Sequence, residues 1–338
     1  IRATAEHFAG VVALGPVSTG GNDSTGIYAH TDMGSTYVIA GDVTTSGNNS
    51  AGIVNEANGT SVTIFGNANT AGANSPAVTA TDPLSDVLVL GLSATTKGIN
   101  SWGISASSVD GDVGVAVGFV STEGDNSTGI RAFTENGNVG VLAGSVGTEG
   151  NDSTGIRAVS LYGDVRVTAA AVGTLGEDSD GIRAFSRDGN VNVDVLAAGT
   201  FGNDSDAIRA VALGGNVEVN AGLVGTFGAG SDGIRAFSRD GNVVVNARGP
   251  LAAVGDGSHG IHARSENGST EVLVEIGVLG GSGADGAGVI FGGGTSAILR
   301  NQGTITSLNW RAIVNDDNNS VVENNDTVIG FVEMGGGD

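Results

Sequence analysis

The sequence contains no cysteine, a single lysine and four prolines, and only 4% of its 338 residues are aromatic. Without cysteine, the chain has no disulfide framework and no thiol chemistry. With so few aromatic rings, the core has to be built from Ile, Val, Ala and Leu. The sequence also lacks a signal peptide and an apolar run of 18 or more residues, so we expect no direct membrane insertion of this chain.

Helix-forming residues and positive charge are also scarce. Leu, Lys, Glu and Gln are few, whereas 60 Gly and many Val, Asn, Asp, Ser and Thr favour strands and turns, which excludes helical repeats. The net charge is −22, with 36 acidic residues against 14 basic ones. Because nucleic acids and anionic membranes bind cationic surfaces, we expect no nucleic-acid partner.

A repeat of about 26 residues runs through the whole chain. Each repeat carries an aliphatic residue, usually after Gly, which we call the anchor. The anchors are Ile1, Ile27, Ile53, Val78, Ile104, Ile130, Ile156, Ile182, Ile208, Ile234, Ile261, Val289 and Ile313. Only the last two intervals, 28 and 24, differ from 26 by more than one residue. A fixed period in this range is typical of a solenoid, in which each repeat stacks on the previous one.

The residues of one repeat predict a three-sided coil. Apolar and polar residues alternate in 182–187 and again in 191–195, and a shorter apolar stretch follows in 197–201. Period-two alternation is the strand pattern, and it predicts that Ile182 is buried and Arg183 exposed. Asp- and Gly-containing turn signals separate the three stretches.

We therefore predict an all-β fold, a single-stranded three-sided parallel β-helix (β-solenoid) of about 26 residues per coil and about 13 coils. Each strand would pair with its copy one repeat away, at a spacing of about 4.8 Å. Residues 1–277 would form regular coils and residues 278–338 divergent C-terminal coils that cap the same solenoid. Two stretches look less regular, namely 82–98 and the segment that begins at Gly249-Pro250.

Three polar or small-residue ladders accompany the anchors. Glycine lies seven residues after the anchor at positions 34, 111, 137, 163, 189, 215, 241 and 268. Serine lies three residues before the anchor, from Ser24 to Ser258, and Asn or Asp precedes most of these serines, from Asp23 to Asp204. We expect the glycines to need a positive φ and the serine hydroxyls to bond the turn backbone. The Asn/Asp ladder fits a turn better than a Ca²⁺ site, since half of it is Asn.

The body pattern GNDSTGIRAVSLYGDVRVTAAAVGTLGEDSDGI (150–182), the segment NQGTITS (301–307) and the closing GFVEMGGGD (330–338) resemble the passenger region of Gram-negative autotransporters. The resemblance implies a right-handed parallel β-helix, exported through the outer membrane by a C-terminal translocator barrel and displayed at the bacterial cell surface or released. The chain starts at Ile1-Arg2-Ala3, within a repeat, so we expect a fragment of a longer protein with the signal peptide and barrel outside it.

The strongest candidate for binding is an outward-facing ladder of arginines directly after the anchors. It consists of Arg131, Arg157, Arg183, Arg209 and Arg235, beside a column that contains Phe133, Phe185 and Phe237. One interpretation is local pairing with Asp180, Asp206, Asp232, Asp188 and Asp240. The other is a stripe that binds anions or glycans, with the Phe side chains exposed beside the arginines.

The sequence shows no metal set, no cofactor motif and no catalytic constellation. His259 and His262 flank Ile261, but no further Cys or His completes a metal site. We therefore expect no cofactor and no enzyme activity. The leading hypothesis is a structural stalk or adhesin that contacts host or cell-surface glycans or proteins, or that self-associates. The alternative is a carbohydrate-active β-helix enzyme, a polysaccharide lyase or hydrolase, which would need long loops around a cleft.

Overall fold

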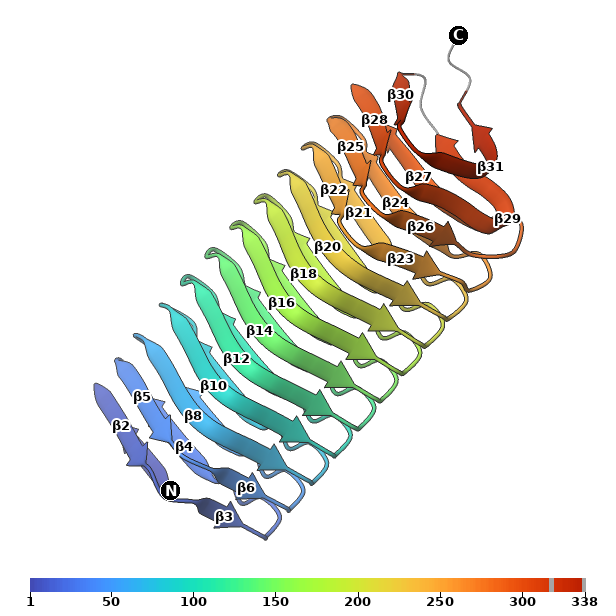
Figure 1. Ribbon diagram of the computed structural model, residues 1–338. Helices are drawn as coiled ribbons and strands as arrows, with labels where there is room; N and C mark the ends of the chain where they lie inside the picture. Colours follow the sequence, from blue (N-terminus) through green and yellow to red (C-terminus); the bar gives the residue numbers. More distant parts are fainter. Residues whose placement is uncertain (316–318, 336–338) are drawn as a thin grey trace. The chain divides into compact units, whose positions relative to one another are not determined.

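The computed structural model describes residues 1–315 and 319–335 and contains no helix among them. The described strands pair in parallel into a β-solenoid of about 12 turns, with equivalent residues about 26 apart, so the predicted fold class is confirmed with one turn fewer (Figure 1). The chain divides into two compact units, Ile1–Arg166 and Val167–Asp338. Residues 336–338 of the closing GFVEMGGGD motif lie outside the described residues.

Unit 1 begins with two coils of three short strands, and from β7 onward each coil has one short strand and one ten-residue strand. Its strands are β1 (Arg2–Ala5), β2 (Phe8–Ala13), β3 (Val17–Thr19), β4 (Ile27–Thr31), β5 (Ser35–Ala40), β6 (Val43–Thr45), β7 (Ile53–Glu56), β8 (Ser61–Thr70), β9 (Val78–Asp82), β10 (Val87–Thr96), β11 (Ile104–Ser108), β12 (Val113–Thr122), β13 (Ile130–Thr134), β14 (Val139–Thr148) and β15 (Ile156–Ser160). Strand β16 (Val165–Thr174) spans the division between the units.

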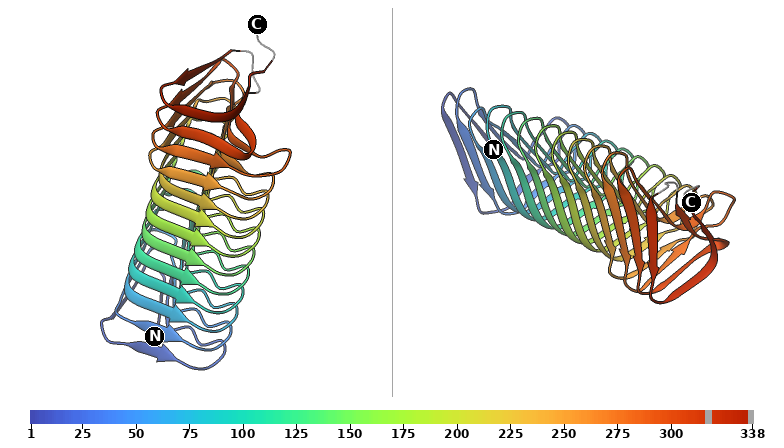
Figure 2. Two further views of the ribbon diagram at one scale, coloured as in Figure 1. Left: turned by 45° about the vertical axis from the view of Figure 1, so that its right-hand side comes forward. Right: turned by 90° about the horizontal axis from the view of Figure 1, so that it is seen from above.

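Unit 2 keeps the alternation of short and ten-residue strands up to β21, and from β22 onward most of its strands are shorter than ten residues. It contains β17 (Ile182–Ser186), β18 (Val191–Thr200), β19 (Ile208–Ala212), β20 (Val217–Thr226), β21 (Ile234–Ser238), β22 (Val243–Ala247), β23 (Pro250–Ala253), β24 (His259–Ser265), β25 (Ser269–Val274), β26 (Gly277–Gly280), β27 (Ala287–Gly293), β28 (Ser296–Asn301), β29 (Thr304–Asn315), β30 (Ser320–Asn324) and β31 (Thr327–Glu333). Within each unit, equivalent strands of successive coils lie side by side (Figure 2).

The second and third strands predicted for a coil are one continuous strand in the regular repeats. Strand β18 runs over ten residues from Val191 to Thr200, and Leu196 is the only residue that the pairing with β20 skips. The two predicted strands therefore meet at Leu196, and the residues on both sides of it stay paired with β20. Near Gly249-Pro250 the two stretches do separate, into β22 and β23, as they also do between β5 and β6 and between β25 and β26.

The stretch 82–98, which looks irregular in sequence, is regular in the structure. Strand β10 pairs residue by residue with β8 on one side and β12 on the other. Pro83 lies in the turn before β10, where no ladder hydrogen bond is required of it. The expectation of a disturbance here is therefore wrong, and the variation is confined to side chains.

The anchors form the centre of each coil. From Ile27 to Ile261, each anchor has 0% exposed surface, and each pairs with the anchor of a neighbouring coil, as Ile208 does with Ile182 and Ile234. Valine and alanine columns of the long strands complete the core. The alternation within β17 is as predicted, with Ile182 buried and Arg183 exposed.

The turn glycines are needed for close backbone approach and not for a positive φ, so that expectation is wrong. None of Gly111, Gly137, Gly215 and Gly241 has a left-handed backbone. A Cβ added to Gly137 would lie 2.2 Å from the carbonyl oxygen of Gly111 in the preceding coil. The ladder of glycines therefore lets consecutive turns stack backbone on backbone.

We expect Gly137→Ala to destabilise unit 1 strongly and Gly140→Ala, three residues later, to leave its stability unchanged or slightly higher. The new Cβ at Gly137 meets backbone that cannot rotate away, whereas nothing lies within 4 Å of a Cβ at Gly140. Overpacking of this kind costs about 1–3 kcal/mol or more. Chemical denaturation of the two variants measures the difference, and equal midpoints would contradict the close-approach explanation.

Most of the positive φ values belong to the Asn/Asp ladder. Asp23, Asn49 and their equivalents up to Asp204 have φ between 52° and 55°, and Gly230 continues the column at 66°. Asn and Asp tolerate this conformation better than other L-residues. The interpretation of this ladder as turn chemistry is confirmed.

The serine ladder bonds the turn backbone, as predicted. In unit 2, the Ser205 hydroxyl donates to the carbonyl oxygens of Asn203 and Gly176, and it accepts the N–H of Ser179 in the preceding coil. Thr200 donates from its hydroxyl to the Ser205 carbonyl at 2.5 Å. The serine and threonine hydroxyls of this turn thus find hydrogen-bond partners both in their own coil and in the preceding one.

Candidate functional site

Three arginines and a histidine surround a cavity of about 320 Å³ in unit 2, which we call the arginine cavity. Its lining residues come from strands β19, β21 and β24. They are Arg209, Val211, Arg235, Ala236, Phe237, His262 and Arg264. No carboxylate is among them, so the lining is cationic and partly apolar.

Strand alternation and register explain why these side chains meet. Each anchor points into the core, and the residue after it points outward. The pairing of β21 with β24 sets Arg235 beside His262 and Phe237 beside Arg264. The arginine column of the sequence therefore continues into His262, and the Phe/Val column continues into Arg264.

The arginines of the cavity form no close ion pair with the acids that the sequence suggested as partners, although Asp180 and Asp206 interact with the charges of Arg209 and Arg235 at longer range. Among the described residues, no carboxylate oxygen forms an ion pair within 4 Å with Arg209, Arg235 or Arg264. The exposed acids Asp188 and Asp240 pair instead with the arginines directly before them in sequence, at 3.6 and 2.9 Å. Local pairing thus occupies Arg187 and Arg239 and does not involve the guanidinium groups of the cavity.

Asp180, Asp206 and Asp232, which we call the aspartate column, are buried and bond the backbone instead of the arginines. Each is at most 6% exposed. The Asp206 N–H donates to Oδ1 of Asp180 at 2.9 Å, and the Asp232 N–H donates to Oδ1 of Asp206 at 2.8 Å. The carboxylates therefore join successive coils, which corrects the predicted pairing with the arginine ladder.

Burial and mutual repulsion set the protonation of this column. Burial raises the pKa of Asp180, and burial together with the charges of Asp232 and Asp180 raises the pKa of Asp206 to about 7. Burial would also raise the pKa of Asp232, but hydrogen bonds from His259 and His262 hold it well below its usual range. The column thus contains one carboxylate that stays ionised and one that readily takes up a proton.

His259 occupies the next place in the aspartate column. Its N–H donates to Oδ1 of Asp232 at 2.9 Å, and its ring Nδ1 lies 2.7 Å from the same oxygen. Burial lowers the pKa of His259, but the hydrogen bond and charge of Asp232 outweigh it and raise the pKa overall. Sequence reasoning searched for a third Cys or His beside His259 and His262 and so missed Asp232, which lies one coil earlier.

Of the predicted site residues, Arg209, Arg235 and Phe237 line the arginine cavity, and the others lie outside it. In unit 1, Arg131 of β13 lies opposite Arg157 of β15 in the strand register. Its guanidinium stacks over the Trp102 ring, 5.1 Å from the ring centroid. In unit 2, Arg183 is exposed, and it lies opposite Arg209 in the register of β17 and β19. The sequence predicted exposed phenylalanine side chains, but Phe133, Phe185 and Phe237 are half-buried.

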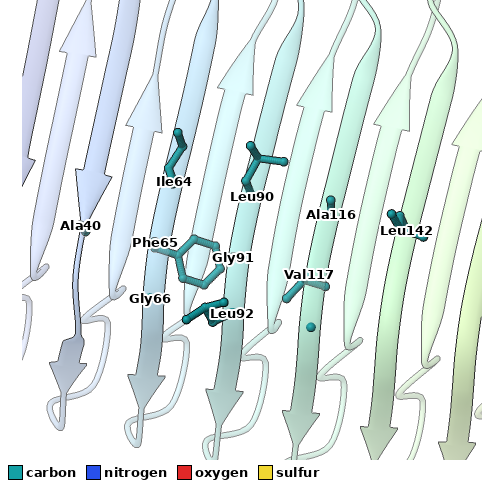
Figure 3. Close-up of a pocket in the computed structure, with 11 residues that line it drawn as sticks. Ala40, Ile64, Phe65, Gly66, Leu90, Gly91, Leu92, Ala116, Val117 and Leu142 are labelled. Atoms are coloured by element: carbon teal, nitrogen blue, oxygen red, sulfur yellow. The ribbon is translucent and has the colours of Figure 1, made fainter.

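A second cavity, of about 570 Å³, lies on the long strands of unit 1 and is apolar (Figure 3). Ile64, Leu90 and Leu142 line it, and the Phe65 ring lies over Gly91, where an added Cβ would be 2.1 Å from the ring. Its lining contains no charged or hydrogen-bonding side chain. The surface therefore offers no group for catalysis or for polar recognition.

The fold is a parallel β-solenoid, and unit 2 carries a cavity with a cationic lining. Comparison with protein-family models, with curated proteins and with solved structures found no match. Nor does the described part of the chain have a helix long and apolar enough to cross a membrane.

Proposed function

We propose that this protein is a non-enzymatic β-solenoid that binds acidic glycans at the arginine cavity. The observation that carries the proposal is the set of three guanidinium groups without carboxylate partners around one cavity. Arginine forms paired hydrogen bonds with carboxylates and sulfates, which are the charged groups of acidic sugars. Phe237 and Val211 supply apolar surface for the ring faces of a sugar.

The resemblance to autotransporter passengers extends the proposal to location. A passenger that works as a stalk or adhesin at the bacterial cell surface meets host or neighbouring-cell glycans, many of which are sulfated or carboxylated. The regular coils also support a binding role over an enzymatic one, because a lyase or hydrolase usually builds its cleft from long loops.

Binding of a sulfated hexasaccharide, measured by titration calorimetry, tests the proposal. We expect the triple variant Arg209→Ser, Arg235→Ser and Arg264→Ser to bind at least about 100-fold more weakly, because each charge-assisted hydrogen bond contributes about 1.5–3 kcal/mol. The double variant Arg131→Ser and Arg157→Ser removes the same side chains from unit 1 and serves as the control. Unchanged binding by the triple variant would place the site elsewhere, and no binding by the unaltered protein would favour a plain stalk.

One observation favours the alternative, a carbohydrate-active enzyme. Asp206 and Asp232 are neighbouring carboxyl groups whose pKa values are pushed apart, which is the arrangement of an acid and a base in glycoside hydrolysis. Their burial and their bonds to the backbone favour the structural role. Product release from acidic polysaccharides that Asp206→Asn abolishes would support the enzyme instead.

A further inference from the structure

We propose that Asp232, His259 and His262 bind a divalent transition-metal ion, with Zn²⁺ as the ion that best suits one carboxylate and two imidazoles. One ligand atom from each of these residues lies within 4.8 Å of the others. Metal binding requires neither a sugar nor the arginines, so it can be tested independently of glycan binding, although His262 belongs to both sites.

The solenoid register creates the cluster. Asp232 and His259 each lie two residues before an anchor, and those anchors, Ile234 and Ile261, pair directly. His262 follows Ile261 and projects from the same strand as His259. Two histidines of β24 thus meet a carboxylate of the preceding coil, and the rings of His259 and His262 pack edge to face with centroids 5.4 Å apart.

The separations suit a tetrahedral ion after small side-chain movements. Zinc bonds of about 2.0–2.1 Å at tetrahedral angles place neighbouring ligand atoms about 3.3 Å apart. In the structure, Nδ1 of His259 lies 2.7 Å from Oδ1 of Asp232, and Nδ1 of His262 lies 3.7 Å from Oδ2 of the same carboxylate. The first distance has to widen by roughly half an ångström. The second goes to the other oxygen of the carboxylate, so coordination through one oxygen also requires rotation of the carboxylate or of the His262 ring.

The second nitrogen of His259 orients the ring for a cation. Nε2 lies 2.9 Å from the carbonyl oxygen of Asp285, an acceptor that requires a proton on Nε2. In the neutral ring, Nδ1 is then a bare lone pair that faces a carboxylate oxygen. A positive group has to lie between these two atoms, and it is either a second proton or a metal ion. A ligating histidine whose other N–H donates to a backbone carbonyl is a common outer-sphere arrangement in metal sites.

The three ligand side chains become more exposed in the order Asp232, His259 and His262, so an ion can enter from the His262 side. The Asp232 side chain is 6% exposed, His259 16% and His262 29%, so the carboxylate is sheltered and one imidazole faces solvent. His262 also lines the arginine cavity, which gives water and ions a route to the cluster. Arg235 and Arg264 at that cavity repel a cation, whereas the overall charge of −22 attracts one.

Calorimetric titration of the chelator-treated protein with ZnCl₂ tests the site. We expect one ion per chain. His262→Ala removes a ligand, so it should weaken Zn²⁺ binding at least as much as loss of an outer-sphere partner does, which is about 10- to 100-fold. His262 is half-buried, and its Nδ1 lies 3.7 Å from the Asp232 carboxylate, longer than a normal hydrogen bond, so we expect this variant to fold. His7→Ala removes an exposed imidazole from unit 1 and should leave the affinity unchanged.

Co²⁺ provides a second readout, because intense visible absorption reports tetrahedral coordination. The unaltered protein and His7→Ala should show this absorption, and His262→Ala and Asp232→Asn should not. Absence of bound Zn²⁺ in the unaltered protein would overturn the proposal. So would Zn²⁺ binding of equal affinity in His262→Ala, since the ion would then be held elsewhere.

Discussion

Replacing Ile208 by Asp should unfold unit 2 or destabilise it by more than about 4 kcal/mol. Ile208 has no exposed surface and lies between Ile182 and Ile234, the equivalent anchors of the two adjacent coils. A carboxylate there finds apolar neighbours on both sides and neither water nor a hydrogen-bond donor, so the cost of burying it is uncompensated. Because each coil supports the next, we expect the loss to spread along the unit.

The control for this change is Arg183→Ala, which alters an exposed side chain of a neighbouring strand. Its guanidinium lies outside the core, so its removal should change the free energy of unfolding by no more than about 0.5 kcal/mol. Urea denaturation followed by circular dichroism measures both variants. Similar midpoints for the two would mean that the inward and outward faces of the strands are assigned wrongly.

The second large effect is on the pH dependence of the free energy of unfolding, and it comes from the raised pKa of Asp206. In the unfolded chain this carboxyl ionises near its usual value of 3.8, whereas in the folded protein its pKa is about 7. Between these values the folded state binds a proton that the unfolded state does not, so the free energy of unfolding falls as the pH rises. The contribution is fully present below pH 3.8 and is lost by about pH 7, and it amounts to on the order of 4 kcal/mol.

Asp206→Asn should abolish the loss of stability that the ionisation of Asp206 causes as the pH rises. An amide oxygen can still accept the Asp232 N–H, and it carries no charge that Asp180 and Asp232 would repel. We therefore expect the unaltered protein to lose about 2–3 kcal/mol more than the variant between pH 5 and pH 8. Denaturation in the presence of a chelator keeps metal ions away from Asp232. A variant that is less stable than the unaltered protein at pH 8 would show that the charged hydrogen bond outweighs repulsion and burial.

The candidate site was only partly predictable. Arg209, Arg235 and Phe237 follow from the repeat, since each occupies a place that the period assigns to an outward-facing column. His262 and Arg264 occupy the same columns one coil later, and reading the register past the change of residue type would have found them. That the rings of the Phe column are half-buried follows from the packing of adjacent long side chains, which a single repeat does not reveal.

The 26-residue period and the alternation within it were enough to determine the class of fold, the buried anchors, and the serine and Asn/Asp turns. These features are repeated in every coil, so each depends on residues close in sequence and on identical copies above and below. The tertiary structure alone decided the rest. It showed that the Gly137 ladder serves backbone contact, that the aspartate column is buried and bonds backbone, and that Asp232 meets two histidines. Such properties depend on which side chains the register places next to one another and on how much water remains between them.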